Sequence, residues 1–218
     1  MVVVLLAVLC GCSTVASFTA EKFGQAKRAI LVGRLNKACE AQQKLQVALQ
    51  SAREQFESLV KFEGENGQKQ SDRMAAALAR CEARAEDVPV RIAEVDRAGQ
   101  NLFREWKSAS EKHPDEMYRR DGGAKRRNTK RDYNQMMAVM RNAESKIEPA
   151  LSMFRNQVES VQSVVLDPSF YLDNGLNADA KASIQDASTK LAAQVNFLAQ
   201  NLSDSIAEAN LFIQKIAD

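Results

Sequence analysis

The sequence predicts an all-α fold: an elongated, antiparallel up-down bundle of four long helices with coiled-coil heptad packing. Charged residues make up 27% of the chain, and only 9 Gly and 4 Pro are present, a composition typical of long helices. Apolar residues also recur at alternating steps of three and four along four stretches, which keeps one side of each helix facing a partner. Three clusters of turn-forming residues separate these stretches.

Each stretch has its own apolar register. The registers cover residues 31–59, 74–109, 133–164 and 184–216. Gln42 is the only polar member of the first register, and the second register, which ends at Ala109, has none. The third includes Gln157, and the fourth includes Ser188 and Ser205. Four amphipathic helices of about 40 to 45 residues, each about 65 Å long, are therefore expected.

The connections are predicted at residues 63–67, 112–115 and 167–177, where Gly, Pro, Asn and Asp gather. Because the first two are short, the helices that they join should pack antiparallel. Pro89 and Pro149 lie inside predicted helices, and each should bend or interrupt its helix because proline has no N–H to donate. The pair Gly122 and Gly123 is expected to mark a turn or a helix break.

The N-terminus resembles a bacterial lipoprotein signal. An apolar run over residues 2–9 leads into Leu9, Gly11 and Cys12, which match the residue types of a lipobox, and the run is too short to span a bilayer. We expect a signal peptide at 1–11, a lipidated tether at 12–20 with the lipid on Cys12, and a helical bundle domain at 21–218. No Lys or Arg precedes Lys22, so the charged region of a signal is missing. A start codon placed too far downstream would explain this, and an uncleaved apolar N-terminus is the alternative.

A lipid on Cys12 would hold the protein on a membrane without spanning it. The resemblance to lipoproteins favours the inner leaflet of the outer membrane, facing the periplasm, because Ser13 stands where inner-membrane retention is associated with Asp. Two cysteines then remain in the domain, Cys39 and Cys81. Folding the first two helices back on each other sets them about 16 Å apart along the axis. A disulfide needs Cα atoms within about 7 Å, so both are expected to be buried free thiols.

Residues that could carry catalysis or bind a metal are sparse. His113 is the single histidine and lies in a predicted turn, where it has no nearby metal or triad partner. No Cys-x-x-Cys follows the signal, and no glycine-rich phosphate loop or nucleophile elbow occurs. Met136, Met137 and Met140 could suggest a soft metal site, but core packing is the favoured reading. We expect no enzyme activity, cofactor, metal site or small-molecule substrate.

A basic cluster follows the second predicted turn. Its seven members, with Asp121 as the one acid among them, are Arg119, Arg120, Lys125, Arg126, Arg127, Lys130 and Arg131. In an up-down bundle this turn points back toward Cys12, so anionic lipid headgroups are natural partners, at about 1 kcal/mol per basic residue. The alternative is that acidic stretches on neighbouring helices neutralise the cluster. Nucleic acid is not expected, since the net charge is only +2 and Tyr118 and Tyr133 flank the cluster without interleaving with it.

Five segments resemble a bacterial lipoprotein family called domain of unknown function 2959. They are KRAILVGR at 27–34, QFESLVKF at 55–62, VRIAEV at 90–95, LFREW at 102–106 and AESKIEPAL at 143–151. The chain departs from the family at 167–177, where a longer loop replaces a short Lys-His-Asn-Leu-Asn-like connection.

The resemblance implies a coiled-coil envelope protein without an assigned activity. We therefore expect a non-enzymatic lipoprotein with a structural or protein-interaction role, through an envelope protein partner or self-association. The alternative is association with anionic membrane through residues 119–131, and an enzyme or a metal-binding protein is the least favoured class.

Overall fold

The computed structural model describes the backbone of residues 12–60, 67–172 and 175–217, and side chains of these segments from residue 25 onward, except at 60 and 172. The expected signal peptide at 1–11 lies outside the described residues. Helix α1 spans Cys12–Val60, α2 Gly67–Lys112, α3 Glu116–Ser145, α4 Ile147–Val165 and α5 Ala178–Ala217. A short 3-10 helix, η1 (Pro168–Phe170), and two two-residue strands, β1 (Tyr171–Leu172) and β2 (Gly175–Leu176), precede α5.

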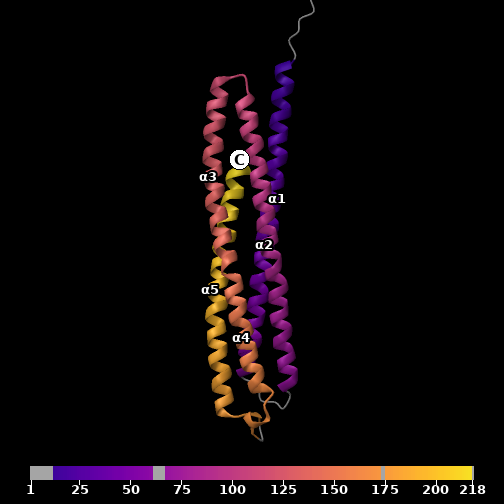
Figure 1. Ribbon diagram of the computed structural model, residues 1–218, viewed down its shortest axis with the longest axis vertical. Coiled ribbons are helices and arrows are strands. Elements are labelled where there is room, and N and C mark those ends of the chain that lie inside the picture. Colours follow the sequence, from indigo (N-terminus) through magenta and orange to yellow (C-terminus); the bar gives the residue numbers. More distant parts are fainter. Residues whose placement is uncertain (1–11, 61–66, 173–174, 218) are drawn as a thin grey trace, which may run out of the picture.

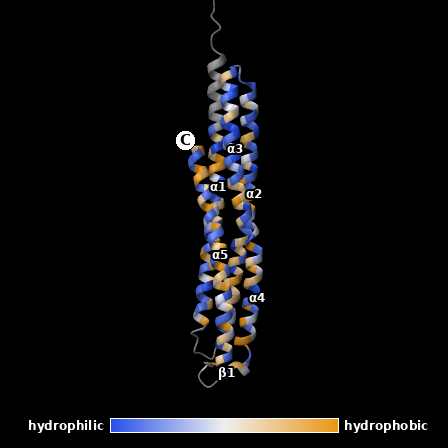
Figure 2. Ribbon diagram, turned by 90° about the vertical axis from the view of Figure 1, so that its left-hand side faces the viewer, coloured by the Kyte–Doolittle hydropathy of each residue, from blue (hydrophilic) through white to orange (hydrophobic). Residues whose placement is uncertain are grey.

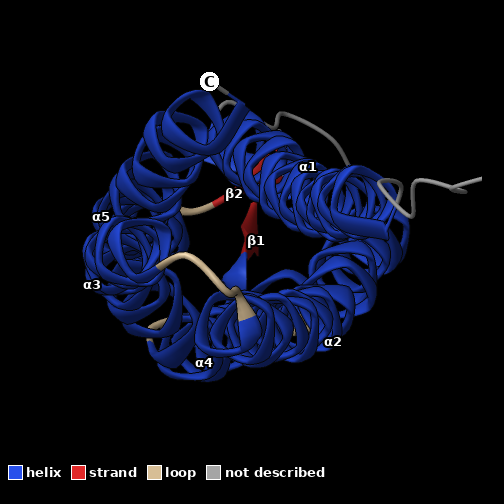
Figure 3. Cartoon of the chain, turned by 90° about the horizontal axis from the view of Figure 1, so that it is seen from above, coloured by secondary structure: helices blue, strands red, loops and turns tan. Residues whose placement is uncertain are grey.

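The helices form a long rod, with α3 and α4 following each other along one side (Figure 1). Seen from the end, they surround a common core (Figure 3). Helix α1 packs against α2 and α5, and both α3 and α4 pack against α2 and α5. The predicted all-α bundle of four antiparallel helical arms is confirmed. The expected tether at residues 12–20 belongs to the first turns of α1.

Most residues of the predicted registers are buried in the core. The second register is wrong at its end, where Ala109 is exposed and Ser110 is buried instead, and Leu78 and Trp106 are only half-buried. In α1 the side chains of Leu31, Leu35, Leu45, Leu49 and Phe56 are buried. Apolar residues of α2, α3, α4 and α5 complete one continuous cluster along the rod. Figure 2 shows hydrophilic and hydrophobic residues alternating along the helices. Burial of such stripes is the main stabilising term of a bundle.

Pro149 interrupts the third arm, as predicted. The arm is divided at Lys146 into α3 and α4, and the Lys146 N–H donates to the carbonyl of Ala143 at 3.1 Å, a tight three-residue step. The apolar register continues past this break, since Ile147, Ala150, Phe154 and Val161 are buried as predicted. The exception is Gln157, which is half-buried, while its neighbour Val158 is buried. Pro89, by contrast, is exposed, and α2 continues through it without interruption.

The expected break at Gly122 and Gly123 is wrong. Helix α3 runs without interruption from Glu116 to Ser145. Asp115 caps its first turn, and Lys, Arg and Ala around the pair favour helix, which offsets the cost of about 1 kcal/mol per helical glycine. A methyl group added at Gly122 would lie 3.7 Å from Cβ of Ser110 on α2, an ordinary van der Waals distance, so the packing of the two helices does not require glycine at this position.

The segment with η1, β1 and β2 closes the end of the rod where α4 ends and α5 begins. The hydroxyl of Tyr171 donates to the carbonyl of Val165 at 2.7 Å, and Gly67 at the start of α2 packs against both groups. A side chain at Gly67 would overlap the Val165 carbonyl, so only glycine fits this approach. Gly175, in the β1–β2 turn, has φ of 117°, which is also a conformation that favours glycine.

Candidate functional site

The basic cluster, defined as Arg119, Arg120, Lys125, Arg126, Arg127, Lys130 and Arg131, lies on the first turns of α3. The turn between α2 and α3 is at the same end of the rod as the start of α1 (Figure 1). We call this the basic end. Residues 116–132 contain seven Lys or Arg and three Asp or Glu, a net charge of +4, whereas the whole chain has +2. The remainder of the chain is therefore negative, and the rod is electrostatically polar along its length.

The side chains of the basic cluster are exposed, apart from Arg126, which is half-buried. The closest carboxylate contact in the cluster is between Arg131 and its neighbour Asp132, at 3.8 Å. Within the described part of the chain, no carboxylate of α1, α2 or α5 forms an ion pair with these seven residues. The alternative was that acidic residues of neighbouring helices neutralise the cluster. Among the described side chains, no such ion pairs between helices are formed.

Two arginines of the cluster differ from the other five, because one binds the turn and the other is partly buried. The Arg119 guanidinium donates to the carbonyls of His113 and Pro114, at 2.8 and 3.1 Å, and so fastens the α2–α3 turn to α3. The Nε atom of Arg126 is buried and has no hydrogen-bond partner within the described residues. The remaining five cationic groups extend into solvent and are available to an external anion.

The turn itself is well defined by local hydrogen bonds. The Asp115 carboxylate accepts from the N–H groups of Met117 and Tyr118, at 2.8 and 3.4 Å, and so caps α3. His113 accepts from the Asp115 N–H through Nδ1, and its ring stacks on Tyr118 with centroids 3.9 Å apart. The histidine that sequence reasoning assigned to a surface turn is therefore part of the turn's framework.

Helix α5 ends short of the basic end. Near its end, Lys215 pairs with Asp132 at 3.2 Å, and Phe212 packs on Tyr133 with ring centroids 5.8 Å apart. Between this contact and the basic end, the rod consists only of α1, α2 and the start of α3, as Figure 1 shows. Arg28 of α1 lies over the Trp106 ring of α2 in this section, 5.5 Å from its centroid, a cation–π contact that links the two helices.

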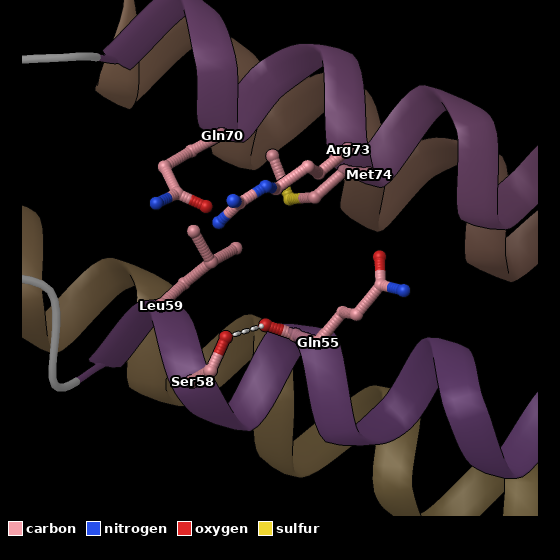
Figure 4. A pocket seen from close by; sticks show the side chains of 6 residues that line it. All are labelled: Gln55, Ser58, Leu59, Gln70, Arg73 and Met74. Atoms are coloured by element: carbon pink, nitrogen blue, oxygen red, sulfur yellow. Dashed lines mark hydrogen bonds between the residues drawn. The ribbon is translucent and has the colours of Figure 1, made fainter.

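A hollow lies near the other end of the rod. It is a shallow cleft of about 250 Å³ between α1 and α2, lined by Gln55, Ser58, Leu59, Gln70, Arg73 and Met74 (Figure 4). Its lining contains no His, Cys, Asp or Glu, so it offers neither a nucleophile paired with a base nor a set of metal ligands. In the described segments, no group of His, Cys, Asp and Glu side chains is arranged to hold a metal ion. No described helix is long and apolar enough to cross a membrane.

Comparison with known proteins gives one match. The sequence matches the family described as protein of unknown function (DUF2959) over residues 18–216. The chain belongs to this family. No curated protein and no solved structure matches it. The resemblance read from the five sequence segments is confirmed, and the match begins after Cys12.

The cysteines and methionines of this DUF2959 protein lie in its core. Cys39 and Cys81 are free and buried, as predicted, and burial raises the pKa of the two thiols to about 11 and about 12. Met136, Met137 and Met140 are buried in α3, which agrees with the packing interpretation.

The sequence did not predict that Gln42 of α1 and Ser205 of α5 form one buried polar layer of the DUF2959 bundle. Gln42 and Ser205 are fully buried, and neither side chain has a hydrogen-bond partner within the described residues. One turn away, the Gln46 amide donates to the Ala199 carbonyl and to the Ser203 hydroxyl, at 2.8 and 2.9 Å. Since α1 and α5 are antiparallel, this contact sets Gln42 and Ser205 at about the same height. The sequence signal was present, because both residues interrupt apolar registers.

Proposed function

We propose that this DUF2959 protein is a non-enzymatic lipoprotein of the cell envelope, held by lipid on Cys12 in the inner leaflet of the outer membrane and facing the periplasm. Its rod has a structural or protein-interaction role, through an envelope protein partner or self-association. The lipobox-like residues and the heptad-packed rod support this proposal. Replacing Cys12 with Ala should abolish incorporation of labelled fatty acid and release the protein from the membrane fraction. Unchanged extraction behaviour would favour the uncleaved apolar N-terminus.

A second role is favoured by one observation: the exposed basic cluster lies at the end of the rod where α1 begins. We propose that this cluster binds anionic headgroups of the membrane that holds Cys12. Each exposed cationic group that approaches an anionic surface contributes about 1 kcal/mol, so the total attraction depends on how many of the five lie close to the headgroups. The attraction is screened beyond about 8 Å at physiological ionic strength, so it should weaken strongly with added salt.

The test replaces five exposed residues of the cluster, Arg120, Lys125, Arg127, Lys130 and Arg131, with Gln. Arg119 is kept because it binds the turn, and Arg126 is kept because its Nε atom is buried. A control with the same loss of charge replaces five exposed residues elsewhere on the rod: Lys37, Arg73, Arg84, Arg97 and Lys190. Each protein is made without a lipid anchor by Cys12→Ala, and its binding to vesicles with and without anionic lipid is measured by sedimentation at several salt concentrations. The cluster variant should bind anionic vesicles more weakly than the control, and equal binding would refute the role of the cluster.

A further inference from the structure

Two large apolar side chains are exposed at the tip of the basic end. Met117 is 70% exposed and Tyr118 is 56% exposed, and they are adjacent in the first turn of α3. Other exposed apolar residues, such as Val47 and Phe197, have no second large exposed apolar residue next to them in the sequence. A single exposed apolar residue is ordinary on a protein surface, but a pair at the tip of a rod calls for an explanation.

Met117 and Tyr118 are held in place by hydrogen bonds and stacking in the α2–α3 turn. Asp115 accepts from the backbone N–H of both residues, Tyr118 stacks on His113, and the Arg119 guanidinium binds the carbonyls of the turn. The two side chains are therefore exposed from an ordered helical turn, so little conformational entropy of the backbone would be lost when the tip meets a partner.

The neighbouring charges indicate the chemistry of that partner. Arg119 and Arg120 follow the pair directly, and both are exposed. Arginine binds phosphate through a planar fork of donors, whereas tyrosine combines an apolar ring with a polar hydroxyl and is enriched at membrane–water interfaces. A surface with phosphate groups above an apolar layer satisfies both sets of side chains at once, and an anionic lipid bilayer is such a surface.

We propose that Met117 and Tyr118 enter the boundary between the headgroups and acyl chains of an anionic bilayer, so that the rod meets the membrane end-on through the α2–α3 turn. This inference rests on the membrane-binding role proposed above and names its point of contact. Helical rise sets Lys130 about 18 Å along α3 from Tyr118, more than two Debye lengths of about 8 Å. An end-on rod therefore contacts lipid through its tip, with the more distant cations contributing only weak attraction.

The experiment introduces a nitroxide label at position 117 through Met117→Cys in the full, membrane-extracted protein. The buried Cys39 and Cys81 should not label under native conditions, and peptide mass spectrometry verifies the labelled position. Collision of the label with oxygen, which concentrates in lipid, and with a water-soluble nickel chelate is measured in anionic vesicles. Val47→Cys is the matched control, because Val47 is also 70% exposed but lies in the second half of α1, away from the basic end.

In anionic vesicles the label at 117 should gain oxygen accessibility and lose nickel accessibility, whereas the label at 47 should change in neither. In the protein made without a lipid anchor by Cys12→Ala, Met117→Ser with Tyr118→Ser should weaken binding to anionic vesicles about tenfold, at unchanged helicity, because two apolar side chains are no longer transferred out of water. A label at 117 that stays accessible to the nickel chelate overturns the inference. If the five-residue cluster variant still binds more weakly than its control, the proposed membrane role survives that result. If the cluster variant and its control bind equally, the membrane role itself fails.

Discussion

The ring of Tyr133 on α3 lies directly over Gly99 on α2, where a Cβ atom would overlap the ring. The Tyr133 hydroxyl is 3.3 Å from Oδ1 of Asp96 and 3.4 Å from the carbonyl of Val95. Burial, with a further contribution from the Asp96 carboxylate, raises the pKa of the phenol, so it remains a neutral donor. Since Phe212 of α5 packs on the same ring, this contact joins three helices where α5 ends.

The first prediction follows from this contact. Gly99→Ala should lower the free energy of unfolding by about 1–3 kcal/mol, because the added methyl group forces the Tyr133 ring out of place. Gly33→Ala is the matched control, since nothing lies within 4 Å of a Cβ added at this exposed helical position. That substitution should stabilise the protein by about 0.5–1 kcal/mol. Urea unfolding followed by circular dichroism measures both, and equal changes would contradict the close approach of α2 and α3.

The second prediction concerns the polar layer of Gln42 and Ser205. Gln42→Leu should raise the free energy of unfolding by about 1–3 kcal/mol, because the buried amide has no hydrogen-bond partner among the described residues to offset the cost of its desolvation. Gln43→Leu, at the exposed neighbouring position, is the control and should change stability little. A loss of stability in the Gln42 variant would show instead that the amide is hydrogen-bonded, most simply to buried water shared with Ser205.

The third prediction concerns the thiols. Because burial raises the pKa of Cys39 to about 11 and that of Cys81 to about 12, both should remain protonated and unreactive at neutral pH. Alkylation followed by peptide mass spectrometry should find them unmodified in the native protein and modified in denaturant. Rapid native labelling of Cys81, whose side chain is fully buried, would mean that α1 and α2 separate in solution.

The sequence was sufficient to predict the arms of the bundle, since heptad spacing and turn residues depend on local patterns. It could not predict that α3 continues through Gly122 and Gly123, because glycine's intrinsic preference was overridden by the Asp115 cap and by the helix-forming residues around the pair. Nor could it place Val158 rather than Gln157 in the core, since both fit steps of three and four between the buried Phe154 and Val161. At the candidate site, sequence identified the cations, but the exposure of Met117 and Tyr118 depends on the tertiary arrangement.

The fourth prediction is a pH dependence centred on Glu94. Partial desolvation alone would raise its pKa, but the hydrogen bond and charge of Arg91, together with Arg34 on α1, lower the pKa overall. A lowered pKa in the folded state means that the stabilisation is present above the ordinary value of 4.5 and is lost as the pH falls through the lowered value.

Glu94→Gln should therefore lower the melting temperature at pH 7, and the difference from the wild type should shrink toward pH 3. Glu57→Gln serves as the control, because Glu57 pairs with Arg53 on the same helix only and should matter less. A deficit in the Glu94 variant that persists unchanged at pH 3 would assign its effect to packing rather than to charge.

The fifth prediction distinguishes the two prolines. Proline lacks an N–H and clashes with the carbonyl four residues earlier, so each substitution by Ala restores a donor. Pro89→Ala should raise stability by up to about 3 kcal/mol, because Pro89 is exposed and α2 is already helical around it. Pro149→Ala should raise stability less, because the buried Ile147, Ala150 and Leu151 are packed for a broken arm and must shift if α3 and α4 join.

Hydrogen exchange provides the decisive measurement. In Pro149→Ala the amides of residues 146–150 should become more protected as the helical ladder closes, whereas in Pro89→Ala protection should rise only locally, near residue 89. If Pro149→Ala left exchange around Lys146 unchanged, the break would be imposed by the packing of α4 on α2 and α5. Proline would then only accommodate a break that the core requires.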